Sequence, residues 1–192
     1  MRDRTKNKTK LAIPLFIIGI MILSTFGVMI GGLSSDTEVL KYHNFIFKKS
    51  NNGYVFNANG QQYYILESPL NVEKFYTEYP IDFLQDINTK KIYLDVSNEK
   101  DIEYSGKIYT NLKGKINLDL SCVQGAESER CANLPIKNCS EEQDSIIIIF
   151  DSTENKTSIY NNGCMSFYGT KTYLEGVSDT FVMITTGVFN GK

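Results

Sequence analysis

The chain has 192 residues, of which 42% are hydrophobic and 22% charged, and this composition excludes a wholly disordered protein. Its formal net charge of −2 gives no reason to expect a nucleic acid as partner. Four cysteines are too few for a small disulfide scaffold, and one histidine with no tryptophan narrows the choice of catalytic and metal sites.

The charges are unevenly distributed along the chain. Residues 1–10 hold five basic side chains and one acidic one, residues 11–33 hold none of either sign, and residues 34–192 hold 15 basic and 21 acidic groups. A helix of 23 residues is roughly 34 Å long, enough to cross a hydrocarbon core of about 30 Å. We therefore predict a transmembrane helix, a signal anchor, over residues 11–33, with the lipid bilayer as its partner.

The basic flank predicts the orientation of this single-pass protein. Lysine and arginine before the span favour a cytoplasmic tail over residues 1–10 and a cell-membrane protein with its C-terminal domain outside. A cleaved signal peptide, processed within residues 31–35, is the alternative, although its apolar region is usually only about 7–15 residues long. A pilin-type precursor also starts with basic and then apolar residues. Whether the segment is retained or removed stays open.

The rest of the chain predicts a short polar tether over residues 34–41 and one extracytoplasmic domain over residues 42–192, of mixed α/β (α+β) class. An N-terminal β-meander is indicated by aromatic and β-branched runs and by turns such as Asn59-Gly60. Its predicted strands cover residues 42–47, 54–57 and 61–66. Ser68-Pro69 predicts the start of a short helix that reaches Tyr76, before Tyr79-Pro80 ends it.

The second part of the domain alternates between strand and helix patterns. Strands at 91–96 and 116–120 flank helical spacing within 99–115, which predicts a β-α-β unit in a mixed sheet. The apolar run Ile146–Phe150 predicts a strand buried on both faces. A hairpin is predicted over residues 157–168. The last segment predicts a C-terminal amphipathic helix on the sheet, from apolar residues spaced three and four apart: Leu174, Val177, Phe181, Ile184 and Val188.

The four cysteines, Cys122, Cys131, Cys139 and Cys164, all fall in the predicted outer part. No C-x-x-C occurs, which excludes the motifs of thioredoxin-like chemistry and haem attachment. An even count outside the membrane predicts disulfides, and we favour 122–131 with 139–164. The second bond would close a loop of 26 residues and contribute roughly 3–4 kcal/mol. The pairing 131–139 with 122–164 stays open, as do free thiols in a reducing compartment.

The loop over residues 121–145 is long and rich in acidic side chains, which suggests either an acidic recognition surface or a solvated loop held by disulfides. It also contains one of the two N-glycosylation sequons of the predicted outer domain. The acceptors are Asn138 and Asn155, if the host glycosylates its proteins. A disulfide at Cys139 would hinder modification of Asn138.

Few residues suggest chemistry. His43 is the only histidine, so any Ser-His-Asp or Cys-His pair must use it, and we predict that it lies on a strand surface. Asp95 lies at the end of one predicted strand and Asp151 just after another, so both would reach one edge of the sheet, a weak pattern for acid–base catalysis. No phosphate-binding loop occurs. We therefore assign no catalytic, cofactor-binding or metal-ligating residue and expect no cofactor.

Three segments together resemble a known pattern. The run Cys131–Cys139, the strand Ile146–Phe150 and Asn162-Gly163-Cys164 are similar to those of uncharacterised archaeal single-pass membrane-anchored proteins with a small cysteine-containing outer domain. The closing Ser178–Phe181 segment is similar to theirs too. The resemblance implies the same topology and disulfides in the outer domain, and it implies no activity for any residue.

The sequence thus favours a non-enzymatic binding or interaction module of the cell envelope, whose partner is another membrane or envelope protein or a surface ligand. Two alternatives remain. One is a thiol-dependent or other enzyme accessory at the outer membrane face, and the other is a pilin-like surface filament subunit.

Overall fold

The computed structural model describes residues 38–125, 128–140 and 144–189. The predicted cytoplasmic tail and transmembrane segment, residues 1–33, lie outside this part of the chain. In the described part, no helix combines the length and the apolar character needed to cross a membrane. Residues 39–192 form one compact unit.

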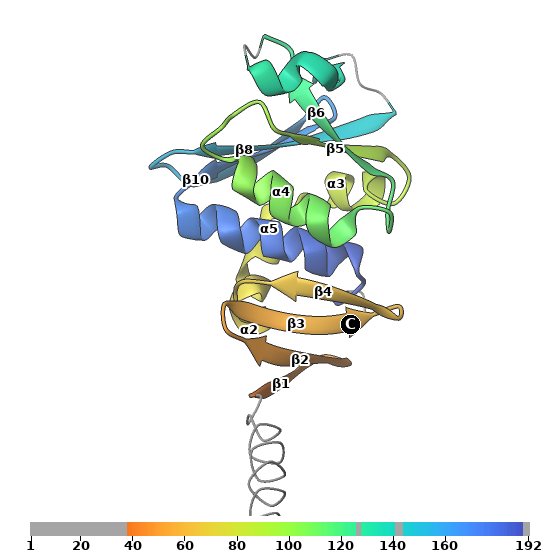
Figure 1. The fold of residues 1–192 in the computed structure, drawn as a ribbon, viewed down its shortest axis with the longest axis vertical. Coiled ribbons are helices and arrows are strands. Elements are labelled where there is room, and N and C mark those ends of the chain that lie inside the picture. Colours follow the sequence, from red (N-terminus) through yellow and green to blue (C-terminus); the bar gives the residue numbers. More distant parts are fainter. Residues whose placement is uncertain (1–37, 126–127, 141–143, 190–192) are drawn as a thin grey trace, which may run out of the picture. The chain divides into compact units, whose positions relative to one another are not determined.

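This unit begins with an antiparallel β-meander, as predicted (Figure 1). Its strands are β1 (Val39–Tyr42), β2 (Phe45–Ser50), β3 (Gly53–Ala58) and β4 (Gln61–Ile65). The first predicted strand is divided in two because His43 has a φ of 50° and reverses the chain. His43 therefore lies in the turn between β1 and β2, not within a strand, and β1 occupies the end of the segment predicted as a tether.

Three short helices follow the meander: α2 (Pro69–Val72), the 3-10 helix η1 (Glu73–Glu78) and α3 (Ile81–Asp86). The predicted helix starts at Pro69 but tightens after Val72, and the extended residue Tyr79 ends it before Pro80. Helix α3 was not predicted, since six residues are too few to show a helical period.

The second sheet is mixed, and its strands in the described residues have the order β7-β6-β5-β8-β10-β9. They are β5 (Lys91–Asp95), β6 (Leu118–Val123), β7 (Ile136–Lys137), β8 (Ser145–Ser152), β9 (Thr157–Asn161) and β10 (Cys164–Gly169). Only β9 pairs antiparallel with its neighbour. Helix α4 (Ile102–Leu112) joins the parallel strands β5 and β6, which confirms the β-α-β unit. Ile146, Ile147 and Ile148 have no exposed surface, as predicted.

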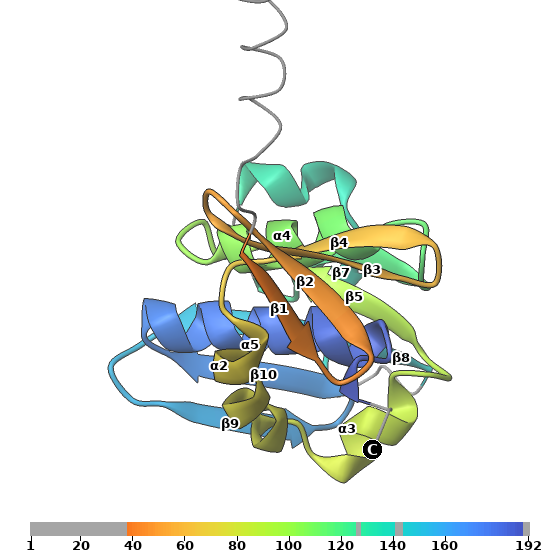
Figure 2. The same cartoon turned by 90° about the horizontal axis from the view of Figure 1, so that it is seen from below.

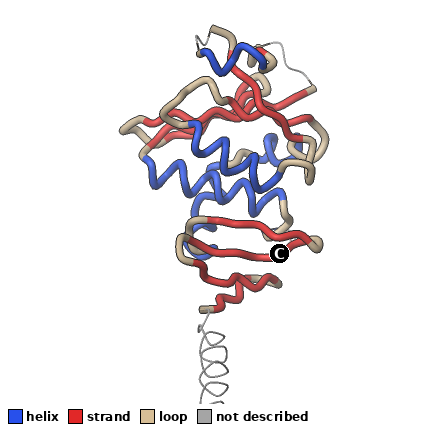
Figure 3. Tube along the Cα trace, in the orientation of Figure 1, coloured by secondary structure: helices blue, strands red, loops and turns tan. Residues whose placement is uncertain are grey.

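Helix α5 (Lys171–Thr185) lies between the mixed sheet and the meander (Figures 2 and 3). It contacts α4, η1 and α2 as well as β4, β8 and β10. The predicted C-terminal helix on the sheet is confirmed. Its polar positions are buried as well, since Ser178, Asp179 and Thr180 have as little exposed surface as the apolar positions. The meander and its short helices cover the side that the hydrophobic period left polar.

Phe75 of η1 packs directly against Gly176 of α5. A Cβ atom there would lie 2.1 Å from Cε2 of Phe75 in η1. We expect Gly176→Ala to lower the free energy of unfolding by about 1–3 kcal/mol, because the buried ring cannot withdraw without opening the core. Denaturant unfolding of the full chain measures this.

Gly106→Ala in α4 is the matched control, since no described atom lies within 4 Å of its added Cβ. This change should be neutral or stabilising by up to about 1 kcal/mol, because alanine favours helix over glycine. Equal stability of the two variants would show that Phe75 and α5 are not packed as described.

Asp86 links α3 to β9. Its carboxylate accepts hydrogen bonds from the Tyr160 hydroxyl at 2.5 Å and from Lys90 Nζ at 3.0 Å. The bond from Tyr160, with that from Lys90, lowers the pKa of Asp86 against the opposing effect of burial. A lowered carboxyl pKa stabilises the fold above the ordinary value of about 3.9, and this stabilisation is lost as the pH falls through the lowered value.

Asp86→Asn should therefore reduce Tm at pH 6, and the difference from wild type should shrink as the pH falls to about 2. Thermal unfolding of both proteins over this range measures the effect. A difference that grows towards low pH would contradict the assignment.

Candidate functional site

A crevice lies at the carboxyl ends of the parallel strands β5, β6 and β8. The chain leaves β5 through α4 towards β6 on one side, and it leaves β8 towards β9 and β10 on the other. Such a point, where the strand order reverses, is where open α/β sheets usually bind ligands. The cavity measures about 270 Å³. Its lining consists of Asp95, Ser97, Asn98, Val123, Gln124, Ile149, Phe150 and Asp151.

Asp95 forms one wall of the crevice. It ends β5, is 8% exposed, and accepts hydrogen bonds through Oδ1 from the backbone N–H groups of Ser97 and Val123, both at 3.1 Å. Its Oδ2 accepts the Ser97 hydroxyl at 2.7 Å. The carboxylate therefore fixes the loop after β5 against the end of β6. The prediction that Asp95 and Asp151 reach one sheet edge is confirmed, since both line this cavity.

A third carboxylate, Asp101, binds the same loop to the end of β8. It precedes α4, is 3% exposed, and accepts Asn98 Nδ2 at 2.6 Å and Ser152 N–H at 3.0 Å. It also accepts the Ser152 hydroxyl. Sequence reasoning missed Asp101, because an aspartate just before a helix is usually an N-cap, yet its side chain bonds to the end of β8 instead.

Asp151 differs from these two carboxylates. It is half-buried on β8, and among the described residues its carboxylate accepts no hydrogen bond and forms no ion pair. No lysine or arginine stands among the described residues that line the cavity. Among the described residues, the crevice therefore combines two acidic side chains, two amides and one hydroxyl with an apolar floor, without a compensating cation.

Two disulfides hold the segments beside the sheet. Cys122 of β6 is bonded to Cys131 of the 3-10 helix η2 (Glu129–Asn133), and Cys139 is bonded to Cys164 of β10. The favoured pairing is confirmed, and the pairing that was left open, 131–139 with 122–164, is wrong. No free cysteine remains. Two such bonds are consistent with an oxidising, extracytoplasmic compartment.

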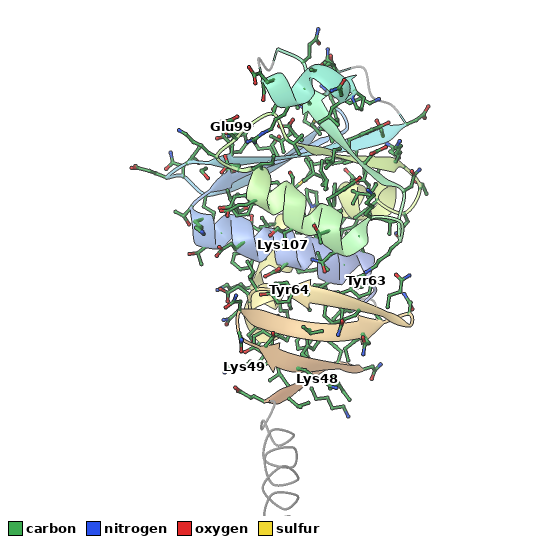
Figure 4. All side chains as sticks on the ribbon, viewed as in Figure 1. Lys48, Lys49, Tyr63, Tyr64, Glu99 and Lys107 are labelled. Atoms are coloured by element: carbon green, nitrogen blue, oxygen red, sulfur yellow. A yellow bond between two sulfur atoms is a disulfide. The ribbon has the colours of Figure 1, made fainter. Side chains whose placement is uncertain are left out.

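The disulfide Cys122–Cys131 stabilises the segments beside the crevice. Val96, Cys122 and Cys131 form a small buried cluster of their own, with Ile102 and Leu134 packed against it. Arg130 of η2 reaches Glu99, in the loop after β5, at 3.6 Å. Figure 4 labels Glu99 on this side of the mixed sheet.

The remaining predicted residues do not join the crevice. His43 stays in the meander turn with its ring edge-on to Tyr42, 4.3 Å between centroids. Within residues 38–125, 128–140 and 144–189, no three His, Cys, Asp or Glu side chains are placed to hold a metal ion.

The two sequons differ in their surroundings. Asn138 donates through Nδ2 to Gln124 and accepts Ser140 N–H at 3.1 Å, so both ends of its amide are engaged. Asn155 is exposed in the turn between β8 and β9. Both remain predicted acceptors, with Asn155 the more accessible.

The chain matches no family model, no curated protein and no solved structure. The resemblance to archaeal membrane-anchored proteins therefore remains a prediction, and functional inference depends on the site itself.

Proposed function

We propose that the chain is a membrane-anchored extracytoplasmic binding module whose crevice takes a small organic cation, such as a primary amine. The observation that carries this proposal is the lining of the crevice, which has acidic Asp95 and Asp151 and no lysine or arginine among the described residues. A cation bound there would compensate the negative charge of these carboxylates, which no described basic side chain of the lining neutralises.

The hydrogen bonds favour binding over catalysis. General acid–base chemistry needs positioned groups that are free to exchange protons with a substrate. Asp95 and Asp101 instead accept hydrogen bonds from neutral donors of the surrounding loops. The bonds from Ser97, Asn98, Val123 and the Ser152 N–H are 2.6–3.1 Å long. Of the two described carboxylates that line the crevice, Asp151 is the one without a hydrogen-bond donor, which suits recognition of an ammonium group.

The proposed location rests on the predicted span over residues 11–33, the basic tail before it and the two disulfides after it. In this arrangement the N-terminus is cytoplasmic and the domain lies outside the cell membrane, where it meets surface ligands and other envelope proteins. The thiol-dependent alternative loses support because all four cysteines are paired. The filament-subunit alternative depends on the N-terminal segment, which lies outside the described residues.

The test uses the full chain in lipid nanodiscs, with putrescine as the cationic probe and acetate as the anionic one. Thermal unfolding is followed by near-ultraviolet circular dichroism of the 12 tyrosines. Putrescine in excess over its dissociation constant should raise Tm, because it binds the folded state only, and acetate should not. Asp151→Asn should abolish the shift.

Asp82→Asn is the matched control, since Asp82 is an exposed aspartate of α3 away from the crevice. It should keep the full putrescine shift. A shift that survives in Asp151→Asn, or an equal response to acetate, would contradict the proposed site. The absence of any shift with putrescine would contradict the proposed ligand class.

A further inference from the structure

The meander differs in charge from the rest of the outer domain. Residues 39–66 contain three lysines and no acidic residue, whereas residues 67–192 contain 19 acidic and 12 basic residues. An anionic surface would therefore attract the meander and repel the remainder.

One face of the meander joins these charges to exposed apolar groups. The register pairs Val39 with Lys48 and Lys41 with Ile46, so all four side chains lie on the same face of β1 and β2. Val39 and Ile46 are 56% and 55% exposed, and both lysines are exposed. Figure 4 labels Lys48 on β2. Lysine stems can lie along such apolar surface while their ammonium groups reach lipid phosphates.

The position of this face in the chain limits what it can meet. Five residues, 34–38, separate the end of the predicted span from Val39. A fully extended chain of this length covers about 17 Å at most. Strand β1 is thus the first element of the domain after the predicted span, β2 pairs with it, and β1 forms the edge of the meander remote from β4.

We infer that the outer face of β1 and β2, formed by Val39, Lys41, Ile46 and Lys48, lies on the anionic headgroups of the membrane that holds the chain. This rests on the anchoring proposed above. Lys41 and Lys48 contact lipid phosphates, and Val39 and Ile46 enter the interface between headgroups and acyl chains. Each lysine near an anionic surface favours the docked state by roughly fivefold.

The absence of tryptophan from the chain provides the experiment. Ile46→Trp places a single reporter on the proposed face, and Ile159→Trp places one on β9, where the isoleucine is 50% exposed. The full chain is reconstituted in phosphatidylcholine vesicles with or without phosphatidylglycerol. Both kinds of vesicle contain a lipid with a nitroxide on its headgroup, and flotation first measures how much chain the vesicles hold.

The indole at position 46 should be quenched roughly twofold or more in excess of the indole at position 159, and only with phosphatidylglycerol present. When Lys41→Gln and Lys48→Gln are combined with Ile46→Trp, the excess quenching at position 46 should be lost. Adding Lys100→Gln and Lys113→Gln should leave it, because these lysines are exposed in the acidic part of the domain.

The two proposals fail in different ways. A chain that does not float with the vesicles contradicts the anchoring and this inference together. A chain that floats with equal quenching at both positions, or with quenching at position 46 that ignores lipid charge and the two lysines, overturns the docking alone. Protection of position 46 that depends on protein concentration instead of lipid charge assigns the face to a second copy of the chain and also overturns the docking.

Discussion

Asp179→Ala is expected to lower the free energy of unfolding by about 3–5 kcal/mol, the largest effect of any single change predicted here. Asp179 is 0% exposed in α5, and its Oδ2 accepts the backbone N–H groups of Leu66 and Glu67 at 3.0 and 2.9 Å. Its Oδ1 lies 2.9 Å from Lys107 Nζ of α4, in the geometry of an ion pair. Burial raises the pKa of Asp179, and Lys107 opposes this effect.

The alanine variant would leave a lysine that is only 13% exposed without its counter-ion, together with two unsatisfied N–H groups. Denaturant unfolding of the full chain measures the loss. Asp119→Ala is the control, because its ion pair with Lys91 is exposed and should contribute no more than about 1 kcal/mol. Replacing both partners, as in Lys107→Met with Asp179→Leu, should recover part of the loss because no buried charge remains.

An Asp179→Ala variant that unfolds like Asp119→Ala would contradict the role given to this carboxylate. That role is to accept hydrogen bonds from backbone N–H groups directly after β4, which pairs with a described strand on one side only. Side chains of α4 and of the segment after it also reach the other edge of β4. The Tyr64 N–H donates to Asn111 Oδ1 at 2.8 Å, and the Gln62 carbonyl accepts Lys115 Nζ at 3.1 Å. An edge strand is thereby satisfied without another strand.

Removing the disulfide Cys139–Cys164 by serine at both positions should cost about 3–4 kcal/mol, because the bond joins residues 25 apart in sequence and restricts the unfolded chain. Removing Cys122–Cys131, which joins residues 9 apart, should cost somewhat less on the same grounds. Denaturant unfolding of the two paired-serine variants, with and without reductant, measures the difference.

The two disulfides should also differ in their effect on the binding of putrescine. The Cys122–Cys131 variant should lose the putrescine response at temperatures where it is still folded, because this disulfide holds the rim of the crevice. The Cys139–Cys164 variant should keep that response. The reverse result would show that the bond between η2 and β6 does not support the crevice. Wild-type stability that does not change with reductant would contradict both disulfides.

Local patterns made much of this fold predictable. Asn59-Gly60 and the alternation around it predicted the meander, and the apolar run at Ile146–Phe150 predicted the doubly buried strand β8. The cysteine spacing was enough to favour the correct pairing. In each case the determining information lies in neighbouring residues or in a short loop closure.

What was not predictable depends on distant contacts. The spacing of apolar residues predicted α5, but it did not predict that Asp179 accepts hydrogen bonds from Leu66 and Glu67, more than one hundred residues earlier in the chain. The turn at His43 requires a positive φ that no glycine signalled. Asp95 and Asp151 were correctly placed at one edge, whereas Asp101 was missed because its partner Ser152 is brought to it only by the parallel sheet.

The most direct test of the proposed outer location is amine modification on intact cells with a membrane-impermeant reagent, read by mass spectrometry of the purified chain. Lys100 and Lys113, both exposed in the domain, should be modified without permeabilisation. Lys6 and Lys8 of the N-terminal tail should be modified only after the membrane is opened. Modification of the tail in intact cells, with the domain protected until lysis, would contradict the membrane-anchored outer module.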